Sequence, residues 1–315
     1  MGSPCEIQLD VVPGPRSDSN PARGLSGVGA EAILASAIAE VERLEQRYSR
    51  YRADSFLSQI NRVAATGGTI DVDPETASLL DYAATCHGES GGLFDITSGI
   101  LRRAWSFNKS KQKRIPEPAE IASLLDRVGH SKLVWRSPVL EFPIAGLELD
   151  FGGIVKEYAA DRMAALLQGA GAPHALVNLG GDIRVAGPRA DGRAWQVGIR
   201  HPRRPDALLR SVPLSEGALS TSGDYERCIE IDGVRYGHVL DPRTGWPVRF
   251  MASASVVGPL CVVAGSASTI ALLKGEDGAD WLERLGLPSL WVDVEGRVGG
   301  SLAGTSLVDS GVDFD

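Results

Sequence analysis

The segments "LDFGGIVKEYAADRM" (149–163) and "HALVNLGGDIRVAG" (174–187) together decide the fold that the sequence predicts. The first has an apolar, strand-like start, a glycine pair and then a helix predicted over about 154–168. The second has two apolar halves, typical of β-strands, on either side of Gly180-Gly181. This glycine pair indicates a β-bulge or a place where another group approaches the backbone, and taken by itself the segment favours the bulge. A helix placed between strand-like segments indicates a fold that mixes sheets with helices.

Upstream of these segments the sequence mainly predicts helices. Their apolar stripes and start signals place them at 29–47, about 75–86 and about 117–127, with a turn and a short helix within 48–62. Asp54 or Ser55 is expected to cap this short helix. The stretch 88–105 is too rich in glycine and serine for a helix until its last third. The first ten residues alternate apolar and polar side chains, which predicts a strand.

Downstream, strands dominate. They are predicted within 132–136, 139–142, 147–154, 174–187, 194–200, 226–242, 253–258 and 289–298, with helices at about 262–274 and 276–285. Asp-Gly inside "EIDGVRY" (230–236) predicts a hairpin. The fold class expected is α+β, with mixed, mainly antiparallel sheets and flanking helices. Residues 1–315 are expected to form one compact unit with two lobes around a cleft. If the lobes have a boundary in the sequence, we expect it near the polar loop at 107–120.

Composition excludes several classes of protein. Hydrophobic residues make up 43% and charged residues 23% of the 315 residues, as in ordinary globular proteins, and no apolar run is long enough for a membrane segment. The net charge is −8 and the basic residues are scattered, which argues against nucleic acid as a partner. The 4 cysteines are far apart without a CxxC pair, so a zinc site is not expected. As written, the chain is expected to be cytoplasmic, or exported if a leader was removed.

Three segments carry side chains suited to chemistry. The glycines of "LDFGGIVKEYAADRM" expose backbone amides near a helix start, which suits a phosphate, although a plain strand-to-helix turn is the alternative. "LSTSGDY" (219–225) gathers hydroxyls and a carboxylate on a glycine turn, and it would bind phosphates or simply be a solvated turn. In "YGHVLDPRTGWP" (236–247), His238 precedes strong turn chemistry, and a structural histidine is the alternative interpretation.

Taken in order, these segments resemble the FAD:protein FMN transferases, a family once labelled thiamine-biosynthesis lipoproteins. The resemblance covers nearly the whole chain. It is carried by Met1-Gly2-Ser3, "YSRYRADSFLSQIN", "GLFDITSG", "DFGGIVKEYAADR", "VNLGGDIRVAG", "LSTSGDY", "GHVLDPRTGWP" and "AGSASTIALLKG".

The resemblance implies a transferase. Members bind FAD in a cleft, split its pyrophosphate with the help of a divalent metal such as Mg²⁺, and attach FMN through a phosphodiester to a threonine of a partner protein, releasing AMP. The family pattern places flavin contacts at Met1, Tyr51, Leu93, Phe94, Asp95, Asp150, Lys156 and Val239. The phosphates or the acceptor loop would be held by Ser220, Thr221, Ser222 and Asp224.

The resemblance also makes His238 the catalytic base. An imidazole titrates near neutrality, so it can take the proton of a threonine hydroxyl that attacks phosphorus.

The metal site departs from the family pattern. The family has an aspartate four residues before a threonine, and both are metal ligands. Here the threonine is Thr269, and Gly265 stands where the aspartate is expected. Gly153 is present to offer its carbonyl. Because Mg²⁺ favours hard oxygen ligands that include a carboxylate, the site is expected to be weaker, and Gly265→Asp is expected to tighten the Mg²⁺ dependence.

Three outcomes follow from this departure: Ser266 or Asp241 replaces the carboxylate, the flavin phosphates hold the metal, or catalysis is lost. Glu157, at a position where the family commonly has glycine, is expected to matter little on a helix surface. The leading function is therefore FMN transfer. The alternatives are an FAD-binding or FAD-hydrolysing relative without transfer activity, and an α+β protein of different chemistry.

Overall fold

The structure, a computed structural model, describes residues 4–10, 27–107 and 114–304. Within these residues the centre of the fold is a seven-stranded sheet in which every neighbouring pair is antiparallel. Its spatial order is β1 (Cys5–Leu9), β5 (Ala175–Leu179), β6 (Asp182–Val185), β9 (Ala218–Gly223), β12 (Met251–Gly258), β13 (Ser289–Asp293) and β14 (Val298–Gly299).

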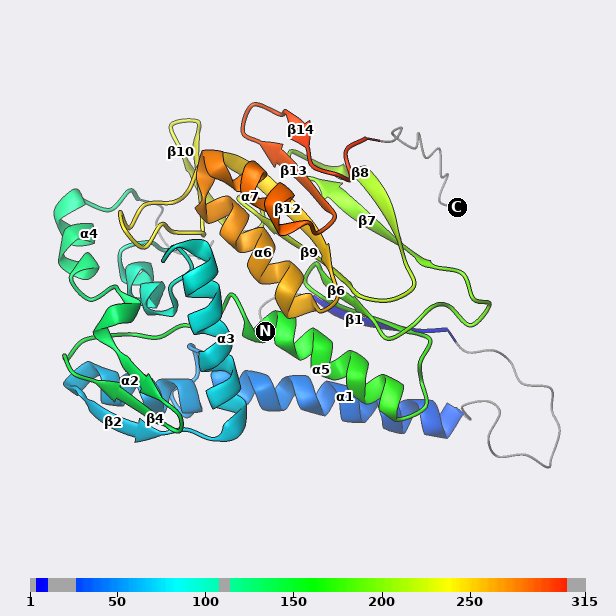
Figure 1. The fold of residues 1–315 in the computed structure, drawn as a ribbon, viewed down its shortest axis with the longest axis horizontal. Coiled ribbons are helices and arrows are strands. Elements are labelled where there is room, and N and C mark those ends of the chain that lie inside the picture. Colours follow the sequence, from blue (N-terminus) through cyan, green and yellow to red (C-terminus); the bar gives the residue numbers. More distant parts are fainter. Residues whose placement is uncertain (1–3, 11–26, 108–113, 305–315) are drawn as a thin grey trace.

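Each face of this sheet buries an apolar layer. Helices α5 (Val155–Gly169) and α6 (Cys261–Leu273) pack on one face, with α1 (Gly27–Tyr48) against α5 and α7 (Gly278–Leu285) against α6 (Figure 1). The hairpin of β7 (Trp195–His201) and β8 (Arg204–Leu214) covers the other face with a second apolar core. Helix α6 is buried on nearly all sides, which explains why its sequence is apolar all round instead of amphipathic.

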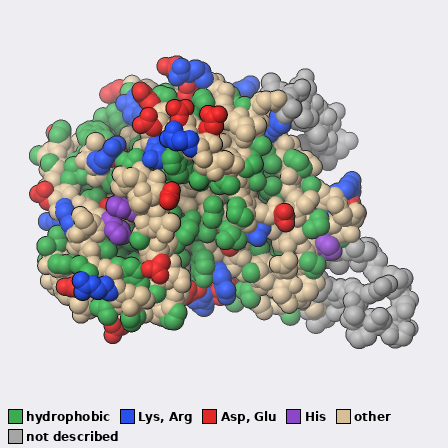
Figure 2. Space-filling model, viewed as in Figure 1, with side chains coloured by type: hydrophobic (Ala, Val, Ile, Leu, Met, Phe, Trp, Pro, Cys, Tyr) green, Lys and Arg blue, Asp and Glu red, His purple; other side chains and the backbone are tan. Residues whose placement is uncertain are grey.

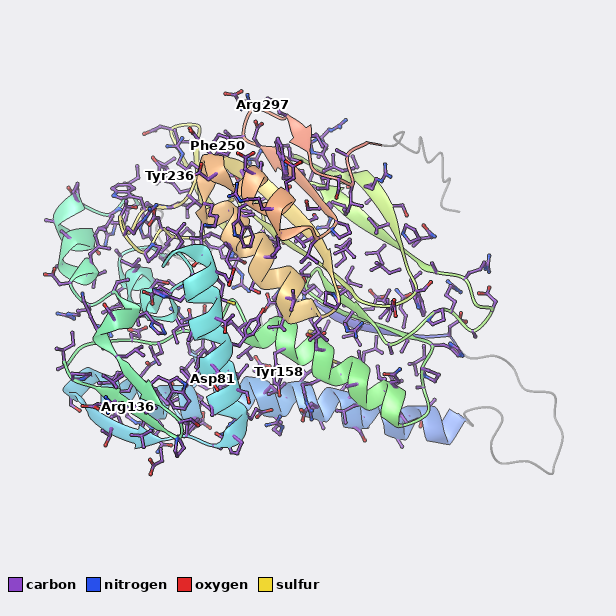
Figure 3. The ribbon with its side chains drawn as sticks, viewed as in Figure 1. Asp81, Arg136, Tyr158, Tyr236, Phe250 and Arg297 are labelled. Carbon is purple, nitrogen blue, oxygen red and sulfur yellow. The ribbon has the colours of Figure 1, made fainter. Side chains whose placement is uncertain are left out.

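A second group of elements extends from the helical side. It contains α2 (Phe56–Thr66), α3 (Pro74–Ser90), η1 (Ile96–Arg103), α4 (Pro118–Leu125), η2 (His130–Lys132), β2 (Gly68–Asp71), β3 (Val134–Arg136), β4 (Val139–Phe142) and the hairpin of β10 (Cys228–Ile231) and β11 (Val234–Gly237); η3 (Gly275–Asp277) precedes α7. The indole of Trp135 donates a hydrogen bond of 2.6 Å to Asp81, which joins the small β2-β4-β3 sheet to α3. Asp81 on α3 is labelled in Figure 3.

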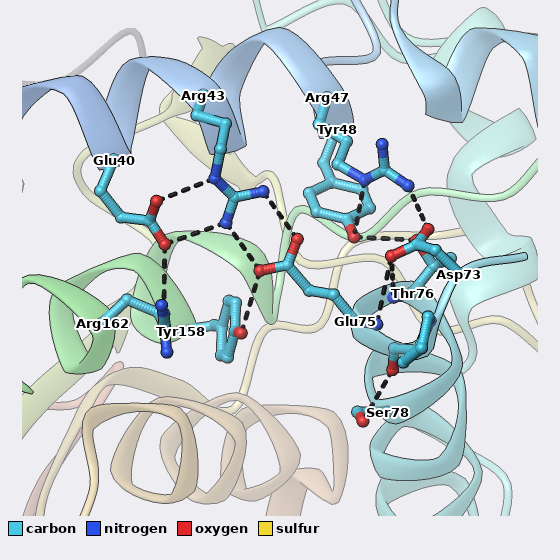
Figure 4. A network of polar contacts seen from close by, with 11 residues as sticks. Glu40, Arg43, Arg47, Tyr48, Asp73, Glu75, Thr76, Ser78, Tyr158 and Arg162 are labelled. Atoms are coloured by element: carbon cyan, nitrogen blue, oxygen red, sulfur yellow. Dashed lines mark hydrogen bonds and ion pairs between the residues drawn. The ribbon is translucent and has the colours of Figure 1, made fainter.

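A polar network fastens α1 to α3 and α5 (Figure 4). The Arg43 guanidinium donates to both carboxylate oxygens of Glu40 and of Glu75. The Tyr158 hydroxyl donates to Glu75, and Arg162 donates to Glu40. Three helices far apart in sequence are thereby held together at a partly exposed seam.

Most of the predicted elements are confirmed. The helices predicted from periodicity are present, and Ser55 caps α2 through a bond from the Ser58 amide to its hydroxyl. The predicted hairpin is β10–β11, whose turn residues Asp232 and Gly233 have φ angles of 52° and 72°. Two residues with positive φ are what a type I′ turn requires. The α+β class with mainly antiparallel sheets is also confirmed.

Four local predictions were wrong. Residues 219–223 belong to a central strand, β9 (Ala218–Gly223), and not to a turn, because this strand pairs with β12 on one side and β6 on the other; only Asp224 and Tyr225 lie in a bend after it. Gly180-Gly181 is the two-residue turn of the β5–β6 hairpin and not a bulge, since Leu179 pairs directly with Asp182. No regular strand ends at Asp150. Helix α3 continues to Ser90, beyond its expected end.

Surface chemistry is mixed on the face in view. Acidic and basic side chains are interspersed there with hydrophobic ones (Figure 2). No helix among the described residues is long and apolar enough to cross a bilayer.

Candidate functional site

Asp150 is the anionic centre of one side of the site. Its carboxylate accepts a hydrogen bond of 2.7 Å from Arg50 and one of 2.9 Å from the Gly152 amide, and Arg102 lies 3.5 Å away. Burial alone would raise the pKa of Asp150, but the charges of Arg102 and Arg50 outweigh it and hold the pKa below its usual value. Tyr51 lies beside this group: its ring is 79% exposed and the Arg50 guanidinium is 5.2 Å from its centroid.

Lys156 lies in the first turn of α5 and points to the β5–β6 turn. Its ammonium forms an ion pair with Asp182, a buried residue, and donates to the Leu179 carbonyl at 3.4 Å. The ion pair fixes the position of a cation at the helix start, close to the glycine turn that precedes it.

His238 directly follows β11 and packs beside aromatic rings. The Phe107 ring lies edge-on at 6.5 Å between centroids, and Trp105 contacts Phe107 and Tyr236, which is labelled in Figure 3. The His238 side chain is half-buried, and within the described residues its buried Nδ1 has no hydrogen-bond partner. Burial, together with the nearby positive charges of Arg102, Arg227 and Lys156, lowers the pKa of His238 to about 4.

Arg102 relates two of the three principal candidates. Its guanidinium lies 3.5 Å from the Asp150 carboxylate, and its charge, like that of Lys156, lowers the pKa of His238. The Asp150 carboxylate and the His238 imidazole thus share Arg102 as a charged neighbour.

The hydroxyls of β9 divide between the two faces of the sheet because side chains alternate along a strand. Ser222 lies 2.9 Å from the Thr269 hydroxyl on α6, and Ser220 contacts Cys261 on the same side. Thr221 bonds to Ser255 at 2.7 Å, on the face opposite α6. The structure thus brings Ser222 to Thr269, buries Ser220 completely and turns Thr221 away.

Asp224 and Val239, two other residues predicted to bind FAD, have partners within the protein. Asp224 forms a two-point ion pair with Arg203, at 2.5 and 2.7 Å. Val239 lies beside His238, and its carbonyl accepts a bond of 3.0 Å from the Val248 amide.

The segment of Leu93, Phe94 and Asp95 is buried and precedes η1. A Cβ built on Gly153 would lie 3.2 Å from the Phe94 ring, so this ring packs closely against the glycine turn. Asp95 caps η1 and also accepts a bond of 2.8 Å from the His130 amide. Met1, the remaining predicted flavin contact, lies outside the described residues.

Glu157 was expected on a helix surface, and this expectation was wrong. Its side chain is buried because it faces α6 and not solvent. A Cβ built on Gly265 would lie 2.5 Å from Glu157 Cγ and 3.2 Å from its carboxylate carbon. Glu157 therefore occupies the space beside Gly265, and its burial raises the pKa of its carboxyl.

The oxygen atoms of Glu157 and of the two residues assigned to the metal by the family pattern are of kinds that suit a hard divalent cation. Within the described residues, the buried Oε2 of Glu157 has no hydrogen-bond partner, which leaves a carboxylate oxygen for a ligand. Thr269 supplies a hydroxyl and Gly153 a carbonyl, and oxygen atoms of these kinds are the usual ligands of Mg²⁺. The described residues contain no group of three or more His, Cys, Asp and Glu suited to a metal, so any cation here would depend on mixed oxygen donors.

Two surface hollows of the described residues lie elsewhere. One, of about 700 Å³, lies between β7 and the β5–β6 hairpin and is lined by Trp195 and Arg189 among others. The other, of about 350 Å³, is lined by Asp95 and the stacked pair His87 and His130. Neither is lined by Asp150, Lys156 or His238, whereas Asp95, a predicted flavin contact, lines the second.

Sequence reasoning missed the residues that hold these groups in place. Arg50 lies inside a segment that resembles the family, and Asp182 directly follows Gly180-Gly181. Their positions in these segments could therefore have identified both residues. Arg102 had no signal, because its role depends on how η1 lies beside Asp150.

Comparison with known sequences gives consistent results. The model of the ApbE family matches residues 1–291. A protein of Klebsiella pneumoniae (strain 342) named FAD:protein FMN transferase is 30% identical over 268 residues, covering 83% of this chain and 76% of that protein. A protein of the same name from Treponema pallidum (strain Nichols) is 31% identical over 280 residues, covering 80% of this chain and 76% of that protein.

Solved structures agree in fold. The ApbE protein of Thermotoga maritima matches with a TM-score of 0.80 and 28% identity, over 94% of this chain and 93% of that chain. The flavinyl transferase ApbE of Pseudomonas stutzeri, in its apo form, matches with a TM-score of 0.80 and 27% identity, over 96% and 98% of the two chains. With the family model, the relatives and the architecture in agreement, this chain belongs to the ApbE family.

Proposed function

We propose that this chain is an FAD:protein FMN transferase that moves FMN from FAD to a threonine of an acceptor protein and releases AMP. Its relatives carry this name. The observation that supports the proposal is the pairing of charged groups in the matching segments, Asp150 with Arg50 and Arg102, and Lys156 with Asp182. Fold alone does not fix function, so the argument rests on these groups.

Different residues of the chain would bind different parts of FAD. The exposed Tyr51 ring beside Arg50 would stack on the flat isoalloxazine, since aromatic faces pair well in offset stacks. Lys156, held by Asp182 in the first turn of α5, would supply positive charge to the diphosphate. Asp150 keeps Arg50 and Arg102 oriented.

His238 would act on the acceptor. The threonine oxygen attacks the phosphorus on the FMN side of the diphosphate, forming a new P–O bond, and the P–O bond to the bridging oxygen breaks so that AMP leaves with that oxygen. The proton of the threonine goes to the imidazole. A lowered pKa keeps His238 neutral at physiological pH, so it is ready to accept a proton.

A divalent cation, with Mg²⁺ as our candidate, would neutralise charge on the diphosphate oxygens when bound. Thr269 and Gly153 would hold it, and Ser222 orients the Thr269 hydroxyl.

The test is a direct assay of both products. The purified protein is incubated with FAD, MgCl₂ and a bacterial lysate, and AMP is measured by chromatography while flavin fluorescence is followed on a denaturing gel. Transfer predicts AMP and a fluorescent band whose modified peptide carries FMN on threonine. AMP with only free FMN would identify a hydrolase instead, and unchanged bound FAD a binding protein.

A further inference from the structure

We propose that Glu157 on α5 supplies the carboxylate ligand of the divalent cation in this chain, from a different helix than the family pattern uses. This proposal rests on the proposed function, because the cation is the one that would act at the FAD diphosphate. In the family pattern the carboxylate comes from the position of Gly265 on α6.

The two positions share one space. Helices α5 and α6 pack side by side on the same face of the sheet (Figure 1). A Cβ at Gly265 would lie 2.5 Å from Glu157 Cγ and 3.3 Å from Glu157 Oε1. An aspartate at 265 would extend from that Cβ into the space that the Glu157 carboxylate already occupies. The glycine at 265 and the glutamate at 157 therefore fit each other.

The position also suits the Thr269 hydroxyl. Residues four apart lie on one face of a helix, one turn from each other. Gly265 precedes Thr269 by four residues on α6, so the two lie on one face of this helix. A carboxylate that reaches across to Gly265 thus lies one helical turn from the residue whose hydroxyl is assigned to the cation.

One oxygen of the buried Glu157 carboxylate is unsatisfied. The residue is 6% exposed, and within the described residues Oε2 has no hydrogen-bond partner. The adjacent cation, Lys156, is paired with Asp182. Asp161, one turn further along α5, accepts from the amides of Cys261 and Val262 and so caps α6, whereas Glu157 has no comparable task. A bound cation would offset the cost of burying this charge.

The substitutes suggested by the sequence are both occupied. The Ser266 hydroxyl bonds to Tyr82 at 2.6 Å and to the Val262 carbonyl at 2.7 Å. The Asp241 carboxylate is held by the backbone and guanidinium of Arg243. Of the three candidates for the carboxylate or hydroxyl ligand, Glu157 is the one with a buried oxygen that has no hydrogen-bond partner within the described residues.

The test measures cation binding without any flavin. Mn²⁺ is titrated into the full-length protein, alone and with ADP, and free Mn²⁺ is followed by electron paramagnetic resonance. Glu157→Gln keeps the shape and removes the charge, so it is expected to weaken Mn²⁺ binding by about 10-fold or more. Glu89→Gln, which removes an exposed carboxylate on α3, is the matched control and should bind like the wild type.

A carboxylate exchange provides a second comparison. Glu157→Gly alone should lose affinity, and the double variant Glu157→Gly with Gly265→Asp should regain it. Wild-type affinity in Glu157→Gln, a double variant no tighter than Glu157→Gly, or a wild type that binds no Mn²⁺ even with ADP would each overturn the proposal. A wild type that binds Mn²⁺ through Glu157 but transfers no FMN would refute the proposed function alone.

Discussion

Arg50 and Asp150 are a hundred positions apart in sequence, and the guanidinium of one lies 2.7 Å from the carboxylate of the other. Arg102 adds a second cation to the same oxygen. Replacing Asp150 by Asn would leave two mostly buried guanidinium groups without an anion, so we expect a loss of about 2–3 kcal/mol in the free energy of unfolding. Urea unfolding measures this loss, and an unchanged midpoint would show that the contact does not contribute.

The same pair predicts how that loss depends on pH. The pKa of Asp150 is lower in the folded than in the unfolded chain, so its stabilisation is complete above the unfolded value of about 4. It disappears as the pH falls through the folded pKa. The stability gap between wild type and Asp150→Asn should therefore be constant near neutrality and shrink below about pH 4. A gap that persisted in strong acid would contradict this.

His238→Ala is expected to leave FAD binding intact and to reduce FMN transfer by about 100-fold or more, as for removal of a general base. FAD binding is measured by quenching of flavin fluorescence and transfer by AMP release. Retained activity in this variant would remove His238 from the catalytic role.

The pH profile gives an independent test of His238. Its lowered pKa of about 4 means that the neutral, proton-accepting form persists in mild acid. The acidic limb of kcat/KM, which reports the free enzyme, should therefore not fall near the ordinary histidine pKa of about 6.5. A limb centred there would assign the titration to a solvated histidine instead.

Gly265→Asp, expected from the sequence to strengthen the cation site, should instead destabilise the protein when made alone. The new Cβ would meet Glu157 Cγ at 2.5 Å, and overpacking of this kind costs about 1–3 kcal/mol. Adding Glu157→Gly should recover most of the loss. Chemical unfolding of the wild type, the two single variants and the double variant gives the coupling free energy between positions 157 and 265. Additive effects would mean that the two positions do not share space.

Arg43→Lys should destabilise nearly as much as Arg43→Ala, by about 1 kcal/mol, because only the guanidinium can engage two carboxylates at two points each. The Arg43 side chain is 44% exposed, so the stability difference between the wild type and either variant should diminish in high salt. Melting temperatures at low and high salt measure it, and a lysine variant as stable as the wild type would contradict the bidentate argument.

Predictions from the sequence succeeded where the signal is local. The helix period of α1 and α5, the Ser55 cap and the Asp232-Gly233 hairpin each depend on residues close in the chain. The strand β9 was missed because its small hydroxyl residues show no apolar alternation. Its identity as a strand comes from pairing with β12 and from packing under α6.

The sequence by itself determined the α+β class, the positions of the main helices and the segments that carry reactive side chains, since these depend on local propensity and spacing. Only the tertiary structure decided which groups meet: that Thr221 faces away from Ser222, that Arg102 reaches Asp150, and that Glu157 fills the space beside Gly265. The periodicity of a helix or strand tells which residues share a face. What that face contacts is decided only when distant segments pack together.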